Sequence, residues 1–126
     1  MEFVPVNIET EGTLDLCVQF RRDAHLVSFG DDTNFNVGET KAWFTKLNTF
    51  DNSGFYHVFK NNEVIGQIEF RNGLLDEQGV KFGYINLLYL LPEYLSIKFE
   101  VRHFLQMRMN ILRWCPIPKS FAWARI

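Results

Sequence analysis

The sequence predicts a layered α/β fold of the α+β type, in which helices pack on a central sheet. A strand-like segment near the amino terminus is followed by two helix-like segments and then by three strand-like segments. The stretch Gly83–Tyr94, GYINLLYLLPEY, is apolar on both faces and too short for a helix with its caps. This is typical of a strand inside a mixed or parallel sheet. The 126 residues suffice for one domain with a proper core.

Composition argues against several classes of function. A net charge of −2 gives no reason to expect a nucleic-acid partner. No apolar run approaches the roughly 20 residues that span a bilayer, so no membrane partner is expected. Cys17 and Cys115 lie far apart, and His57 and His103 have no partners at ligand spacing. We therefore expect neither a metal site nor a disulfide framework, and a reducing, cytoplasmic location.

The amino-terminal segments are expected to form a strand and then a helix. Phe3–Ile8 alternates around Pro5, which favours an edge strand. Thr13 is a plausible N-cap, because apolar residues follow it at helical spacing. The segment Leu26–Gly30 is expected to leave this helix, which places His25 in the loop after it.

A second helix and a hairpin are expected next. The helix is predicted from about Glu39 to Leu47. Its inward residues are expected to be Ala42, Trp43 and Leu47. Strands are predicted at Phe55–Lys60 and Glu63–Arg71, joined by a tight turn at Asn61-Asn62, and an acidic connection at Gly73–Gly79 leads on. Pro92 cannot donate to a sheet ladder, so the next strand is expected to end by Leu91.

The balance of charge changes at Leu95. Residues 1–94 hold 14 acids and 7 bases, whereas residues 95–126 hold one acid and 6 bases. In this basic tail Ser96–Arg102 alternates like a strand, and the pattern of Phe104–Trp114 fits a helix. Two domain-scale segments are therefore distinguished, residues 1–94 and residues 95–126.

Three segments resemble the amino-terminal half of a GNAT-superfamily N-acetyltransferase. FRRDAHLVSFGD at Phe20–Asp31 is similar to the first helix and following loop of a bacterial branch of that family. HVFKNNEVIGQIEF at His57–Phe70 is similar to the second and third strands. GYINLLYLLPEY is similar to the fourth strand. The resemblance covers about residues 1–94.

The resemblance implies an activity and a cosubstrate. A member of this family transfers an acetyl group from acetyl-CoA to an amine, here a small-molecule or peptide acceptor. A bulge in the fourth strand would splay it from its neighbour, so that backbone groups of Tyr89, Leu90 and Leu91 bond pantetheine. Leu90 and Leu91 would present the free groups.

The same resemblance nominates site residues. Glu69 would act as general base and Asn86 would orient a water or a substrate carbonyl. His25 and Tyr84 would contact the acceptor. Each has a plainer alternative: Glu69 an ordinary strand carboxylate, Asn86 a satisfied buried amide, Tyr84 a packing residue, and His25 a solvated histidine.

The chain departs from the family after Tyr94. The family continues into a glycine-containing loop that binds pyrophosphate at a helix N-terminus, but residues 95–126 contain no glycine. The loop and the second half of the family fold are absent from this pattern, so we expect weak binding of acetyl-CoA or none. The break and the charge reversal favour the hypothesis that residues 95–126 are a frame-shifted reading, which the coding DNA tests.

A different class of function competes with the enzyme. The basic, aromatic tail would then serve a non-catalytic interaction or dimerisation protein. Independently, the apolar strand at Gly83–Leu91 is expected to need a cover at its edge. Either Ser96–Arg102 folds back beside it, or two chains form a homodimer there.

Overall fold

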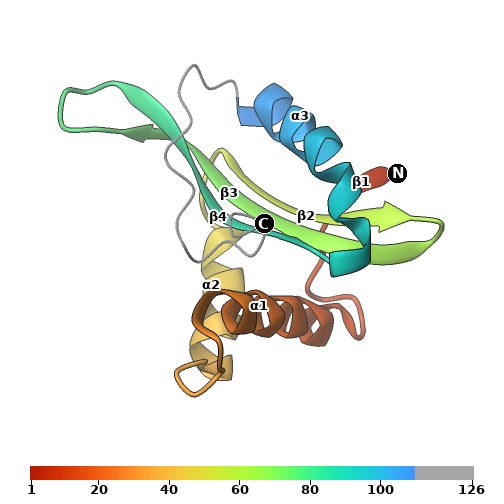
Figure 1. The fold of residues 1–126 in the computed structure, drawn as a ribbon. Coiled ribbons are helices and arrows are strands. Elements are labelled where there is room, and N and C mark those ends of the chain that lie inside the picture. The colour runs from red at the N-terminus through yellow and green to blue at the C-terminus, as the bar shows by residue number, and fades with distance from the viewer. Residues whose placement is uncertain (110–126) are drawn as a thin grey trace.

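A four-stranded antiparallel sheet forms the middle layer of the molecule. A computed structural model describes residues 1–109, and the strands follow one another in the order β1-β2-β3-β4 (Figure 1). Their bounds are Glu2–Pro5 for β1, Ser53–Lys60 for β2, Glu63–Leu75 for β3 and Lys81–Leu90 for β4. The predicted α+β class is confirmed. The prediction of a mixed or parallel sheet is wrong for residues 1–109, because all three strand pairs there are antiparallel and β4 is an edge strand.

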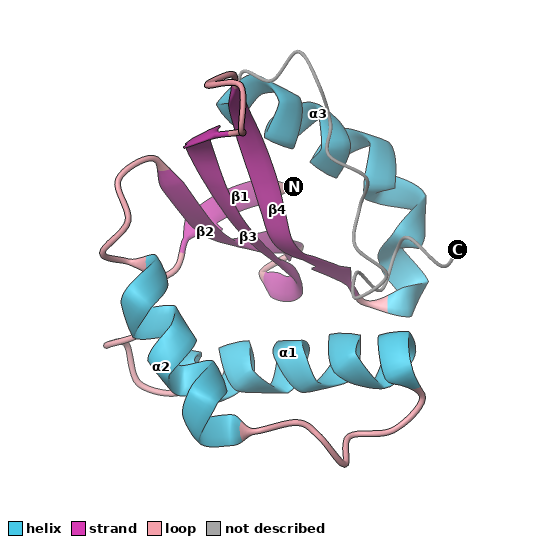
Figure 2. Ribbon diagram, turned by 90° about the vertical axis from the view of Figure 1, so that its left-hand side faces the viewer, coloured by secondary structure: helices cyan, strands magenta, loops and turns pink. Residues whose placement is uncertain are grey.

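Helices cover both faces of this sheet. Helix α1 (Thr13–Phe29) and helix α2 (Val37–Leu47) lie against one face, and helix α3 (Lys98–Met109) lies against the other (Figures 1 and 2). A short 3₁₀ helix, η1 (Pro92–Ile97), joins β4 to α3. No helix within residues 1–109 combines the length and apolar character needed to cross a membrane.

Helix α1 is longer than the sequence pattern predicts. It continues through Leu26 to Phe29 and ends at Gly30, whose positive φ of 82° lets its N–H donate to Leu26 O at 2.8 Å. Leu26 and Phe29 are apolar but exposed, so they do not continue the buried face from which the helix was predicted. Consequently His25 lies on the helix, and its expected position in a loop is wrong.

The second helix and the hairpin agree closely with their predictions. Helix α2 begins two residues earlier than expected, after Asn36, whose side chain caps Glu39 N–H at 2.9 Å. Asn61 and Asn62 form the hairpin turn at positive φ angles of 52° and 65°. Leu47 is buried, but Ala42 is exposed and Phe44 is the buried residue in its place.

Two strand boundaries differ from the predictions. Strand β1 ends at Pro5, and beyond it only Val6 N–H continues the pairing by donating to Phe55 O at 2.9 Å. Strand β3 continues past Arg71 to Leu75, so Leu74 and Leu75 of the expected connection at Gly73–Gly79 are paired with β4. The extended β3–β4 hairpin projects beyond the helical layers (Figure 1).

The start of the basic tail is helical. The prediction of a strand at Ser96–Arg102 is wrong, because this segment forms the end of η1 and the beginning of α3. Its buried residues repeat every four positions and form one stripe, Ile97, Val101, Leu105 and Met109. The alternation of Ile97, Phe99 and Val101 fits a strand, whereas the four-residue spacing of the buried stripe fits a helix. The carboxyl end of the helix predicted at Phe104–Trp114 lies outside the described residues.

This stripe completes the core on one face of the sheet. It packs against inward side chains of β2, β3 and β4, among them Val58, Ile68 and Leu88. On the opposite face Phe20 and Ala24 of α1 contact Leu87 and Tyr89 of β4. Strand β4 therefore buries side chains on both faces, as its sequence predicts, although no strand of residues 1–109 pairs with its outer edge.

Candidate functional site

Strand β4 contains a β-bulge at Asn86. Glu69 lies opposite Leu87 and Phe70 lies opposite Ile85, so Asn86 is an extra residue in β4. Ile85 contributes to the core beneath α3, whereas Leu87 contributes to the core beneath α1. Asn86 therefore shares the α1 face with Leu87. The expected bulge in this strand is confirmed.

Leu91 is not available at the strand's outer edge. Its N–H donates to Ile65 O at 2.8 Å, and its C=O accepts from Tyr94 N–H at 2.9 Å. Both backbone groups are thus used within the chain. The expectation that Leu91 presents free groups is wrong.

Leu88 and Leu90 carry the outward backbone groups instead. Hydrogen-bonding direction alternates along an antiparallel strand, and Leu91 N–H points toward β3. Tyr89, opposite Gln67, therefore also points its backbone inward. Of the three residues expected to bind pantetheine, only Leu90 faces outward, and Leu88 joins it.

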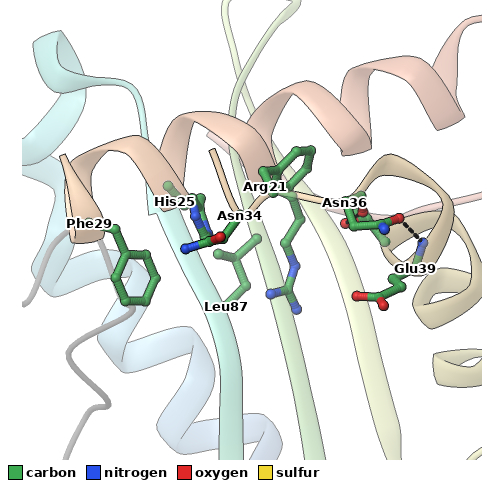
Figure 3. A pocket seen from close by; sticks show the side chains of 10 residues that line it. Arg21, His25, Phe29, Asn34, Asn36, Glu39 and Leu87 are labelled. Carbon is green, nitrogen blue, oxygen red and sulfur yellow. Dashed lines mark hydrogen bonds between the residues drawn. The ribbon is translucent and has the colours of Figure 1, made fainter. Parts of the chain in front are cut away.

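A pocket of about 190 Å³ lies between helix α1, the loop after it, the start of α2 and strand β4 (Figure 3). Leu87 of β4, next to the bulge, forms part of its wall. The other lining residues come from the helices and the intervening loop: Arg21, Ala24, His25, Phe29, Asn34, Phe35, Asn36, Glu39 and Thr40. The structure thus brings His25 to this pocket, although Glu69, Tyr84 and Asn86 do not line it.

The lining combines a carboxylate with aromatic surfaces. Glu39 is exposed and has no ion pair within residues 1–109. Its backbone N–H is held by Asn36, which fixes the position of the residue at the start of α2 (Figure 3). The His25 ring lies 4.6 Å from the Phe29 ring and 5.7 Å from the Phe35 ring, centroid to centroid. A carboxylate beside aromatic faces favours a cationic ligand such as an ammonium group.

Glu69 is enclosed by hydrogen-bond donors. Its side chain is fully buried, and Arg21 donates to both oxygens, at 2.6 Å from Nη2 and 3.1 Å from Nε. Trp43 Nε1 donates to Oε1 at 2.6 Å and Gln67 Nε2 donates to Oε2 at 3.0 Å. Each oxygen therefore accepts two bonds, which leaves no position from which to take a substrate proton. This geometry favours the structural alternative for Glu69 over a general base.

A buried polar chain continues from Glu69 toward α1. Gln67 Nε2 also donates to Cys17 O at 3.3 Å, so its Oε1 faces His57 Nε2 at 2.9 Å and accepts the proton that this nitrogen carries. Burial lowers the pKa of His57, and the imidazole is neutral. Burial, with the Glu69 charge, raises the pKa of Cys17 to about 12. Although its Sγ lies 3.4 Å from His57 Nε2, Cys17 is a thiol and not an activated nucleophile.

Asn86 and Tyr84 lie on the β4 side of the same face. Asn86 Oδ1 is buried and has no hydrogen-bond partner among residues 1–109, so the described residues do not satisfy the oxygen of this amide. Tyr84 pairs with Arg71 of β3 and lies 5.8 Å from its guanidinium. Two buried polar atoms here, Arg71 Nε and Asn86 Oδ1, lack hydrogen-bond partners among the residues that the structure describes.

Several of these residues were missed by sequence reasoning. Arg21 and Glu39 lie on different helices, and no local pattern links them to the strands. Only Asn36, three residues before Glu39, carried a signal, since this spacing is typical of a helix start. No group of three or more His, Cys, Asp or Glu side chains in the described part of the chain is placed to hold a metal ion.

The fold and site define an α+β domain with a bulged edge strand beside a polar pocket. Comparisons with family models, with curated proteins and with solved structures found no match to this chain.

Proposed function

We propose that this chain is an acetyl-CoA-dependent N-acetyltransferase of the GNAT type that its sequence resembles. One observation carries the proposal: the bulge at Asn86 lies next to Leu87, which lines a pocket with a carboxylate that has no ion pair among residues 1–109. A bulge that interrupts an edge strand re-aims its backbone groups. An amine in the pocket and a thioester along β4 would then meet at the bulge.

The residues around the pocket have distinct roles in this proposal. The outward N–H and C=O groups of Leu88 and Leu90 bond the amides of pantetheine as a further strand would. Glu39 attracts the acceptor ammonium and takes its proton, a role that the enclosed Glu69 does not have. Asn86 Oδ1 orients the amine by accepting one of its hydrogens.

The transfer step is then direct. The neutral amine nitrogen forms a bond to the thioester carbonyl carbon, and backbone N–H groups stabilise the oxyanion. The bond from that carbon to sulfur breaks as the tetrahedral intermediate collapses. The nitrogen gives up one proton, the departing thiolate takes up one proton, and the products are the acetylated amine and CoA.

The segment after β4 argues for weak binding of the nucleotide end of CoA. Here η1 leads directly into α3, and Lys98 N–H donates to Leu95 O. Tyr94 N–H is likewise used by Leu91 O. Backbone N–H groups that would hold a pyrophosphate at a helix start are therefore engaged, and no glycine relaxes the backbone there.

Calorimetry with two cosubstrates tests this proposal. Acetyl-CoA and S-acetylpantetheine share the thioester and the amides, but only acetyl-CoA has the nucleotide. We expect both to bind weakly and within about threefold of each other, because the strand supplies the contacts and the phosphates add little. The Glu39→Gln variant should bind each cosubstrate as well as the unaltered protein does, but should bind an amine such as benzylamine less tightly.

Two outcomes contradict the proposal. If neither thioester binds at millimolar concentration, the alternative of a non-catalytic interaction or dimerisation protein is favoured. If acetyl-CoA binds in the low micromolar range and S-acetylpantetheine does not, residues after β4 supply a phosphate site, and the account of η1 fails.

A further inference from the structure

Arg71 contacts three aromatic rings and has no carboxylate partner within residues 1–109. Its guanidinium carbon lies 5.4 Å from the Phe50 ring centroid, 5.8 Å from that of Tyr84 and 6.0 Å from that of Trp43. Its Nε is buried and has no hydrogen-bond partner within residues 1–109. Arg71 as a whole is half-buried, but a buried donor atom such as this Nε ordinarily has a hydrogen-bond acceptor.

Within the described residues, a second arginine that contacts the Trp43 ring, Arg21, is paired with a carboxylate, unlike Arg71. Arg21 contacts the opposite side of the polar cluster, 5.9 Å from the same Trp43 ring, and forms two bonds to Glu69. Lys46 lies 5.9 Å from the Phe50 ring and also has no ion pair in the described part of the chain. The positive charge around Phe50 is therefore not neutralised by residues 1–109.

A complementary acceptor lies on the same face of the sheet. Arg71 is directly opposite Tyr84, and Asn86 follows two positions along β4. Side chains two positions apart share a face and start about 7 Å apart. Within the described part of the chain, Asn86 Oδ1 is a buried acceptor without a partner and Arg71 Nε is a buried donor without a partner. A ligand with a cationic and an anionic end would satisfy both atoms.

We propose that the acceptor amine is an amino acid, whose carboxylate binds Arg71 while its ammonium group donates to Asn86 Oδ1. This inference rests on the proposed function, because it names the substrate class of that transfer. Arg71 and Asn86 lie on β3 and β4 and do not line the pocket that contains Glu39. The guanidinium offers a two-bond fork to a carboxylate, and its contacts with three rings hold the fork in place. The bulge at Asn86 then presents the amine to the thioester.

Titrations without cosubstrate test this inference. The indole N–H resonance of Trp43 is the reporter, since this ring contacts Arg71 and its Nε1 bonds Glu69. The probes are L-leucine and L-leucine methyl ester, which has the same amine and side chain but no carboxylate charge. We expect leucine to bind about tenfold or more tightly than its ester. The Arg71→Gln variant should abolish this preference.

Two further variants keep the test decisive. Arg71→Lys, which keeps the charge, should restore part of the preference for leucine, and Lys46→Gln should leave it within about twofold. A thermal melt confirms that each variant is folded. Equal affinity for leucine and its ester, or an unchanged preference in Arg71→Gln, would overturn the inference.

The outcome is independent of acetyl transfer. Leucine binding through Arg71 would stand even if neither thioester binds. Conversely, acetylation of leucine methyl ester at the same rate as leucine would support the proposed function and contradict recognition of the carboxylate.

Discussion

At Glu69, donors from α1, α2 and β3 converge on one buried carboxylate. Arg21 contributes two bonds, and Trp43 and Gln67 contribute one each. A charge without access to water is tolerated only with such complete pairing. The carboxylate therefore ties both helices of one layer to the sheet.

We expect the Glu69→Gln substitution to lower the free energy of unfolding by about 2–4 kcal/mol. Glutamine has the same size, but it turns an NH₂ group toward existing donors and leaves Arg21 without a counter-charge. Urea denaturation measures the loss. The matched control is Glu77→Gln, at an exposed position in the β3–β4 turn, where we expect a change below about 0.5 kcal/mol. A loss at Glu69 as small as at Glu77 would contradict the structural role.

His57 makes stability depend on pH. Burial lowers its pKa in the folded protein below the ordinary value of 6.5, so the unfolded chain binds the proton more readily. Its contribution is therefore complete above that value and is lost as pH falls below it. We expect the free energy of unfolding to decrease between pH 7 and pH 5, by up to about 1.4 kcal/mol per pH unit from this group.

Substitution of His57 isolates its contribution to the pH dependence of the free energy of unfolding. Glutamine in its place can still donate to Gln67 Oε1 but does not titrate, so His57→Gln should flatten the profile. His103→Gln, at an exposed position of α3, should leave the profile unchanged. A slope that survives in His57→Gln would assign the pH dependence to other groups.

At the scale of elements, α3 is held by its buried stripe. Leu105 is fully buried in the core between α3 and the sheet, whereas Met107 on the same helix is 72% exposed. Leu105→Ala should lower the free energy of unfolding by about 2–4 kcal/mol, because it leaves a cavity. Met107→Ala should change it by less than about 0.5 kcal/mol. Equal effects would mean that α3 does not form part of the folded core.

Elements with local signals were predictable from the sequence. The Asn61-Asn62 turn carries its own conformational preference, and the body of α2 repeats its apolar residues at helical spacing. The end of α1 was missed because its last turns expose Leu26 and Phe29. The start of α3 was missed because a short alternation masks a longer stripe.

The candidate site was less predictable, for a physical reason. The bulge and His25 followed from a resemblance, and their places near the pocket depended on how α1 crosses β4. Whether Glu69 is a base or a structural anchor depends largely on two donor residues distant in sequence, Arg21 and Trp43. Such contacts are set by tertiary packing, which no local pattern encodes.

At the scale of the whole molecule, the described sheet has an unpaired edge at β4. No strand of residues 1–109 pairs with it, and α3 lies across a face rather than along this edge. The expected cover by Ser96–Arg102 is therefore wrong. Pairing of two chains stays a prediction, since an unpaired apolar edge favours association.

Hydrogen exchange at several protein concentrations tests this pairing. The outward amides of Leu88 and Leu90 should become protected as concentration rises, if two edges meet. The amides of Leu87 and Tyr89, which point toward β3, serve as internal controls and should be protected throughout. A monomer whose outward amides exchange rapidly at all concentrations would contradict the dimer, and so would protection independent of concentration.

The bulge at Asn86 gives β4 one residue more than the facing part of β3. Ile85 and Leu87 point to opposite faces of the sheet although they are two positions apart. This is possible because Asn86 and Leu87 together occupy the place of one residue opposite β3. Removing Asn86 would leave the side chains on either side of it on their present faces. It would remove one of the two register shifts between β3 and β4, while the shift between Arg71 and Leu74 would remain. Ile85, Leu87 and Leu88 would still point into the same cores. The bulge therefore changes the direction of β4 locally without changing which of the neighbouring side chains reach the two cores.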